Sequence, residues 1–243
     1  MSAAEESVLR TMAVVIGVAL FCSALVTTAV YLLRPVQAAY AAIERNRSIV
    51  MAAGTMAADA RDDEVVGAFL DLDAVVVDLG TGAVVEDADG HAFDHWAADG
   101  EDGPSAVPVY FRREAGRLQR VVLPVDGQGM WSTIRGYLAL EPDLNTVAAL
   151  VILDHGETPG IGDRIQNPEW LAAWQGKHLR DGAGNIMIDV SDDPAVPVEG
   201  RVDTITGATV TSKAVGRLVR RWLGPEGYVA VLAELASREG APP

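Results

Sequence analysis

The stretch that decides the fold runs from Val107 to Leu153 and reads VPVYFRREAGRLQRVVLPVDGQGMWSTIRGYLALEPDLNTVAALVIL. It contains four segments rich in β-branched and other apolar residues, namely Val107–Phe111, Leu118–Val125, Ile134–Leu140 and Val147–Leu153. Turn-forming residues separate the first two segments at Glu114–Gly116 and the last two at Glu141–Asp143. Because such short connections join antiparallel strands, we predict two antiparallel strand pairs here.

Outward from this stretch, the pattern changes from strands to helices. Upstream, Val75–Leu79, the turn Gly80–Gly82 and Val84–Val85 together predict a hairpin, and the acidic residues from Asp87 to Pro104 predict a loop. Downstream we predict a short strand and three helices, at Ile186–Val190, Pro168–Trp174, Lys213–Leu223 and Tyr228–Leu235. Antiparallel strands with helices toward the ends of the chain indicate an α+β fold rather than alternating βα units.

The N-terminal region has a different composition. Thr11–Leu33 contains no charged residue and would span about 34 Å as a helix, enough to cross an apolar bilayer core of about 30 Å. A cleaved signal peptide is the alternative, but its apolar core is usually shorter, so we favour a retained transmembrane helix. Pro35 is expected to end this helix. We therefore predict a short tail (residues 1–10), a transmembrane helix (11–33), a helical stalk (34–60) and a main domain (61–243).

Charge and cysteine content limit the classes of function. The formal net charge of the 243-residue chain is −15, and an acidic surface repels phosphate backbones, so we expect no nucleic-acid partner. The one cysteine, Cys22, lies in the apolar segment, so no disulfide can form within the chain. His91 and His95 have a spacing that could hold a metal on a helix, but their segment is acidic and contains glycine. We predict a solvated loop there and no metal site.

The most informative polar segment is Asp203-Thr204-Ile205-Thr206-Gly207-Ala208-Thr209-Val210-Thr211-Ser212. It is rich in hydroxyl groups, has two small residues at its centre and leads into an apolar-periodic helix. Gly207 permits backbone angles closed to other residues, and a helix start suits a phosphate group. The segment therefore presents the hydroxyl of Thr209 at a place where a large phosphorylated group can approach. The simpler alternative is that Thr209, Thr211 or Ser212 caps the helix.

Two further segments are candidates for contact with a flat ring. Gly156–Gly162 contains a Pro-Gly turn, in which Gly160 allows close approach and Glu157 and Thr158 could bond the polar edges of a ring. Gly127–Ser132 contains Trp131, which is either a core residue or a neighbour of a ring ligand. Taken singly, the first segment is better explained as an ordinary loop and Trp131 as a core residue.

Together, these segments resemble the C subunit of the Na⁺-translocating NADH:quinone oxidoreductase. The resemblance runs in order along most of the chain and is densest from Gly129 to Gly162. Its main segments are Leu33–Gln37, Ile49–Gly54, Val77–Leu79, Val107–Tyr110, Gly129–Ser132, Leu138–Leu140, Gly156–Gly162, Asn167–Pro168, Trp170, Trp174, Gly176–Lys177, Thr206–Ser212 and Trp222–Tyr228.

The resemblance implies a membrane-anchored flavoprotein in the bacterial inner membrane. It implies one transmembrane helix, a periplasmic FMN-binding domain at residues 61–243 and FMN joined by a phosphoester bond to Thr209. A separate flavin transferase is expected to make this bond. Other membrane subunits of the respiratory complex would exchange electrons with the flavin, and the subunit alone would not oxidise NADH. The cofactor-binding residues implied are Trp131, Glu157, Thr158, Gly160, Ile161, Asp203, Thr206, Gly207, Ala208, Thr209, Thr211 and Ser212.

Two departures from the family pattern accompany this resemblance. Thr206 stands where serine is more usual, but it keeps the hydroxyl group. Asp163-Arg164 stands where a glycine and an acidic residue are expected, which changes the local loop and its charge. The alternatives are the flavin subunit of an Rnf-type complex, a cofactor-free anchored binding domain, and a hydrolase with Thr209 as its nucleophile. The hydrolase would need a histidine, and only His155 and His178 are available.

Overall fold

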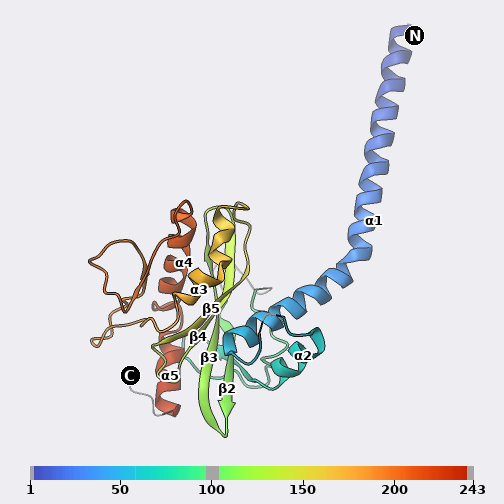
Figure 1. The fold of residues 1–243 in the computed structure, drawn as a ribbon. Helices are drawn as coiled ribbons and strands as arrows, with labels where there is room; N and C mark the ends of the chain where they lie inside the picture. The colour runs from blue at the N-terminus through green and yellow to red at the C-terminus, as the bar shows by residue number, and fades with distance from the viewer. Residues whose placement is uncertain (1–2, 58, 97–103, 240–243) are drawn as a thin grey trace. The chain divides into compact units, whose positions relative to one another are not determined.

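The structure is a computed structural model that describes residues 3–57, 59–96 and 104–239 (Figure 1). It has two compact units, Met1–Ile43 and Glu44–Pro243. Part of the predicted acidic loop, residues 97–103, lies outside the described residues. The second unit contains all the strands and the candidate site.

The N-terminal helix α1 spans Ala3–Ala53 without a break at Pro35. The prediction that Pro35 ends a helix is therefore wrong. Proline removes one backbone donor, but the alanines at positions 38, 39, 41 and 42 have high helix propensity and continue the helix beyond it. The helix also begins within the predicted tail and ends at Ala53 rather than at Ala60.

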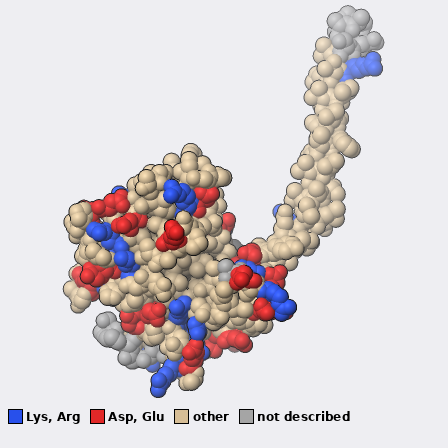
Figure 2. Space-filling view, viewed as in Figure 1, with Lys and Arg blue, Asp and Glu red and all other residues tan. Residues whose placement is uncertain are grey.

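The apolar part of α1 has the length and composition needed to cross a membrane. Among the described residues, one helix meets this criterion, and none of its apolar window is buried inside the protein. Its large side chains, such as Phe21 (69% exposed) and Leu32 (66% exposed), point outward. In Figure 2 the middle of this helix carries no charged side chain. An uncharged, fully exposed apolar helix requires an apolar surrounding such as lipid.

The second unit is built on a five-stranded antiparallel sheet, so the predicted α+β class with antiparallel strands is confirmed. Its strands follow each other in space in the order of the sequence. They are β1 (Asp73–Asp78), β2 (Ala106–Glu114), β3 (Arg117–Gln128), β4 (Thr133–Leu140) and β5 (Val147–Asp154). The two turns predicted at Glu114–Gly116 and Glu141–Asp143 join the expected pairs. A small parallel sheet pairs β6 (Asp189–Val190) with β7 (Arg201–Val202).

Both faces of the large sheet are buried, which explains why its strands are apolar at successive positions. In β3, Leu123 and Val125 belong to one core and Val122 to the other. Helices α4 (Thr209–Trp222) and α5 (Val229–Glu239) cover the first face (Figure 1). The last turns of α1 and helix α2 (Asp62–Leu70) cover the second face. The sheet therefore holds α4 in a fixed position.

Several predicted elements differ in extent from those in the structure. The second arm of the first hairpin is a single bridge from Val77 to Val84. The strand predicted at Ile186–Val190 is reduced to β6, and the helix at Pro168–Trp174 divides into α3 (Pro168–Ala172) and following turns. A 3-10 helix at Gly162–Gln166 precedes α3. Helix α4 starts at Thr209, four residues before the predicted Lys213, so Thr209 lies at the helix start.

Arginine side chains from the sheet form hydrogen bonds with the C-terminal end of α1. Arg112 donates to the backbone oxygens of Ala53 (3.2 Å) and Gly54 (2.9 Å). Arg120 donates to the oxygen of Ala52 at 3.2 Å. The last carbonyl groups of a helix lack partners within it, and cations there interact favourably with the helix dipole. These contacts join the base of α1 to β2 and β3.

His95 lies in the second core rather than in a solvated loop, so that prediction is wrong for this residue. Its side chain is 2% exposed, and its ring packs against Trp96 with 4.4 Å between centroids. Trp96 in turn contacts Tyr137 of β4. Burial lowers the pKa of His95 to about 4, against a raising effect of Asp94 and with smaller lowering effects of Arg45 and Arg135. In the described part of the chain, no group of three or more His, Cys, Asp or Glu residues is arranged to hold a metal.

We expect His95 to make the domain sensitive to mild acid. The unfolded chain binds the proton near pH 6.5 and the folded chain only near pH 4, so stability falls as pH decreases through this interval. The full loss is about 3 kcal/mol. His95→Gln should remove this part of the pH dependence, measured as the unfolding midpoint between pH 7 and pH 4. The exposed His178, changed to Gln, is the control, and an equal response of both variants would contradict the prediction.

Candidate functional site

The hydroxyl-rich segment forms a tight turn that delivers Thr209 to the first position of α4. Gly207 has φ +84°, and the N–H of Ala208 donates to the oxygen of Ile205 at 2.8 Å. A positive φ favours glycine, as the sequence indicated. Thr206 and Thr209 are exposed, whereas Ala208, Thr211 and Ser212 are buried. The hydroxyl-bearing segment therefore has an outer part and an inner part.

The start of α4 has no side-chain cap. Its N-cap residue is Ala208, which has no hydroxyl, and there is no acidic residue in its first turn. Ser212 accepts from the N–H of Ile205 (3.3 Å) and donates to the oxygen of Thr209 (3.2 Å), so it supports the turn from inside. The alternative in which Thr209, Thr211 or Ser212 caps the helix is therefore wrong. An uncapped helix start offers its N–H groups and positive dipole end to an anion.

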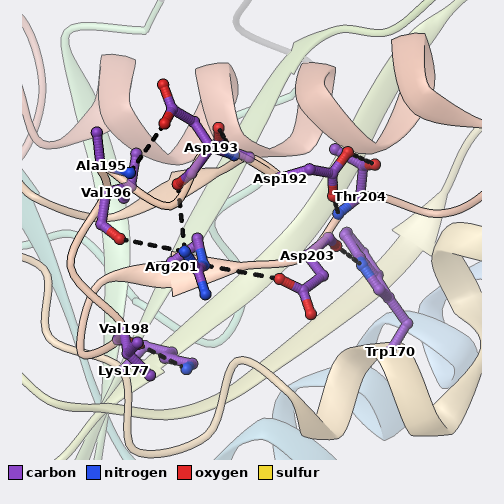
Figure 3. Close-up of polar contacts among 11 residues, drawn as sticks. Trp170, Lys177, Asp192, Asp193, Ala195, Val196, Val198, Arg201, Asp203 and Thr204 are labelled. Atoms are coloured by element: carbon purple, nitrogen blue, oxygen red, sulfur yellow. Dashed lines mark hydrogen bonds and ion pairs between the residues drawn. The ribbon is translucent and has the colours of Figure 1, made fainter.

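Polar contacts from outside the motif hold its first half. Asp192 accepts from both the N–H (3.0 Å) and the hydroxyl (2.5 Å) of Thr204, and these bonds lower the pKa of Asp192. Trp170 donates its indole N–H to the oxygen of Asp203 at 2.9 Å. Arg201 lies 3.7 Å from the Asp203 carboxylate (Figure 3). Asp203 thus belongs to a surface network that orients the motif.

The departure at Asp163-Arg164 contributes to the same site. Arg164 donates to the backbone oxygen of Thr206 at 2.9 Å. Asp163 accepts from the N–H of Gly160 at 2.9 Å and so closes the Pro-Gly turn. Gly160 has φ +77°, which is consistent with a turn that needs glycine. Asp163 and Arg164 therefore link the Pro-Gly turn to the loop that contains Thr206.

The three candidate segments meet in space, although they are far apart in the sequence. Glu157 is 4% exposed, and its carboxylate accepts from the N–H groups of Met130 and Trp131, each at 2.9 Å. Its second oxygen accepts from the hydroxyl of Thr211 at 2.7 Å. Burial raises the pKa of Glu157. The hydrogen bonds from Trp131, Thr211 and their neighbours lower it by more, so the pKa lies below its usual value.

Large apolar side chains are exposed around Thr209. The residues are Met130 (51%), Trp131 (66%), Ile161 (52%) and Val210 (53%). They come from the three segments that Glu157 and Thr211 join, and Thr158 and Gly160 are exposed beside them. The core alternative for Trp131 is therefore wrong. Exposed apolar side chains gathered from separate segments are typical of a binding surface.

The structure offers little support for a threonine hydrolase. Such an enzyme needs a base within hydrogen-bonding reach of the nucleophile. The ring of His155 accepts from the N–H of Glu157 at 3.2 Å and so belongs to the turn. Among the residues that the structure describes, no histidine bonds to Thr209.

The sequence could not reveal the roles of Asp192 and Arg164, because their partners lie 12 and 42 residues away.

Known proteins match this chain in both sequence and fold. Residues 129–224 match the FMN-binding domain family. The C subunit of the Na⁺-translocating NADH-quinone reductase from Pseudomonas aeruginosa is 37% identical over 97% of this chain and 98% of its own length. The protein of the same name from Haemophilus ducreyi is 32% identical over 98% of both chains.

The structural comparison agrees with the sequence comparison. The crystal structure of NqrC from Shewanella oneidensis matches with a TM-score of 0.73 and 32% identity, covering 82% of this chain and 99% of that one. Each of the two relatives from Pseudomonas and Haemophilus bears the name of the Na⁺-translocating enzyme, which favours that family over an Rnf-type complex. The chain belongs to the NqrC family, the C subunits of the Na⁺-translocating NADH-quinone reductases.

Proposed function

We propose that this chain is a flavin-carrying electron-transfer subunit with FMN joined through its phosphate to Thr209. The observation that carries the proposal is the exposed Thr209 hydroxyl at the uncapped start of α4, within the part of the chain that matches the FMN-binding domain family. In the balance of atoms, the Thr209 oxygen bonds to the phosphorus of FMN, and the threonine proton and one phosphate hydroxyl are lost as water. The N–H groups and dipole of α4 would stabilise the charge that remains on the phosphate.

The residues present fit the other parts of FMN as well. The small residues Gly207 and Ala208 leave room for the ribityl phosphate beside the backbone. Trp131 and Ile161 offer exposed apolar area to the isoalloxazine ring. FMN supplies the redox chemistry, and the protein supplies its position, polarity and access. The inner residues Thr211 and Ser212 act by holding the turn, since their hydroxyl groups bond within the protein.

The long apolar helix supports a membrane location for this function. We propose that residues 11–33 anchor the chain in the bacterial inner membrane, with the domain at residues 61–243 on the periplasmic side. There the flavin would exchange electrons with other membrane subunits of the same complex, and a separate transferase would attach it. The relatives' names and the exposed apolar helix found among the described residues support the membrane location, and the family resemblance implies the periplasmic side.

The deciding experiment uses protein from its native membrane. Its intact mass should exceed that of the chain by one FMN less one water, and the added mass should lie in the peptide that contains Thr209. Protease added outside spheroplasts should release a fragment that bears the flavin, whereas purified subunit alone should not oxidise NADH. An unmodified peptide in native material would contradict the flavin assignment. A fragment protected from outside protease but cleaved in inverted vesicles would contradict the orientation.

A further inference from the structure

Glu157 is the only buried carboxylate among the described residues. A charge removed from water is costly unless hydrogen bonds or an opposite charge compensate for it. In the described ranges, no Lys or Arg forms an ion pair with Glu157. The hydrogen bonds from its three neutral donors must therefore compensate for the buried charge. A buried charge of this kind at a binding surface calls for an explanation beyond packing.

The surroundings of Glu157 are shaped around its carboxylate. A Cβ atom at Gly129 would lie 2.5 Å from Oε1 of Glu157, and one at Gly162 would lie 2.8 Å from its Cβ. Both positions therefore need glycine for the side chain to fit. The carboxylate thus occupies a closed space between the 129–132 segment, the 156–162 turn and the first turn of α4.

We propose that Glu157 is a positioning residue that fixes Met130 and Trp131 beside the start of α4, and that its negative charge lowers the midpoint potential of the bound flavin. The first part rests on hydrogen bonds within the chain. The second part rests on the proposed function, since it requires the flavin to be at Thr209. This role differs from direct contact with the ring, because both carboxylate oxygens already bond to the protein.

The electrostatic part follows from the position and burial of Glu157. Glu157 is bonded to Thr211, two residues from Thr209, so its charge lies close to any group attached there. Reduction adds electrons to the flavin, and a nearby negative charge opposes this. Because Glu157 is buried, solvent screens this interaction less than it would at the surface. The oxidised flavin is therefore favoured, and the midpoint potential is lowered.

Two substitutions separate geometry from charge. Glu157→Gln removes the charge, but its amide oxygen can still accept from Met130 and Trp131 and its amide nitrogen can donate to Thr211. Glu157→Ala removes all three bonds. Hydrogen exchange is measured on the full chain in detergent with Thr209→Ala in every sample, so that the result does not depend on flavin. We expect the Met130 and Trp131 amides to exchange at least tenfold faster in the Ala variant and at nearly the original rate in the Gln variant.

The potential is measured on natively matured full-length protein with Thr209 intact. Glu157→Gln should raise the midpoint potential of the flavin, and the exposed Glu169→Gln should leave it unchanged. Unchanged amide exchange in Glu157→Ala would overturn the positioning role. An unchanged or lower potential in Glu157→Gln would overturn the electrostatic role. If the native protein lacked flavin, the proposed function would fail, while the exchange experiment would still decide the positioning role.

Discussion

Replacing Thr209 by alanine is expected to abolish covalent flavin completely. The variant lacks the one atom that can form the phosphoester, and helix α4 should still form, because alanine has a higher helix propensity than threonine. Thr209 is exposed and α4 has no side-chain cap, so the change removes no buried contact and no cap. The measurement is flavin fluorescence in the denatured protein band after expression in the native host, together with intact mass.

Two controls make the Thr209 experiment specific. Thr209→Ser keeps a hydroxyl at the same position and should retain some covalent flavin. Thr206→Ser keeps the outer hydroxyl of the turn and should also retain the flavin, since Thr206 contributes its backbone oxygen to Arg164. A fluorescent band in denatured Thr209→Ala protein would show that the flavin is attached elsewhere.

The strand region was predictable because its signals are local. The turn at Glu114–Gly116 has two residues with positive φ, Ala115 and Gly116, and it returns the chain directly into β3. Apolar residues at successive positions indicated strands, and the structure buries both faces of the sheet that they form. The sequence could not show which helices cover each face, since that depends on contacts such as Arg112 with the end of α1.

The missed helix α2 illustrates the opposite case. Its nine residues include Gly67 and follow directly on a region predicted as part of the stalk. Three acidic residues in its first turn and the bond from the N–H of Arg61 to Glu64 favour a helix start. These signals are weak for so short a helix, which depends on burying Val65 and Phe69 against the sheet.

The sequence singled out the segments that the structure brings together, but not the contacts between them. Thr209 and Gly207 carry local signals, namely a hydroxyl and a glycine before an apolar helix. Glu157 also stood out by its turn, but its partners are 26 to 54 residues away, so its bonds could not be inferred from spacing. The role of each site residue depends on tertiary contacts, whereas its type and its local turn can be read from the sequence.

Replacing Trp222 by alanine should strongly lower the free energy of unfolding of the domain. Trp222 is 5% exposed, its ring stacks on Tyr228 with 5.0 Å between centroids, and its indole N–H donates to the oxygen of Asp126 at 2.7 Å. Loss of a buried tryptophan leaves a cavity and costs about 3–5 kcal/mol. The same change also removes the hydrogen bond that the indole N–H donates to the Asp126 oxygen. Guanidinium unfolding of the full chain in detergent, followed by circular dichroism, measures the loss.

Trp131→Ala is the matched control, because it makes the same chemical change at a side chain that is 66% exposed. Its effect on stability should stay within about 0.5 kcal/mol, as for most surface substitutions. At the flavin the order should reverse. Trp131→Ala removes an indole ring that can quench flavin fluorescence by electron transfer, so it should increase that fluorescence. Trp222→Ala should leave the fluorescence of folded protein unchanged, because Trp222 lies at the far end of α4. If Trp222→Ala lowered the free energy of unfolding as little as Trp131→Ala, the Trp222 side chain would not be what holds α4 on the sheet. Other buried residues of α4, such as Val215, Leu218 and Val219, would then hold the helix against the sheet.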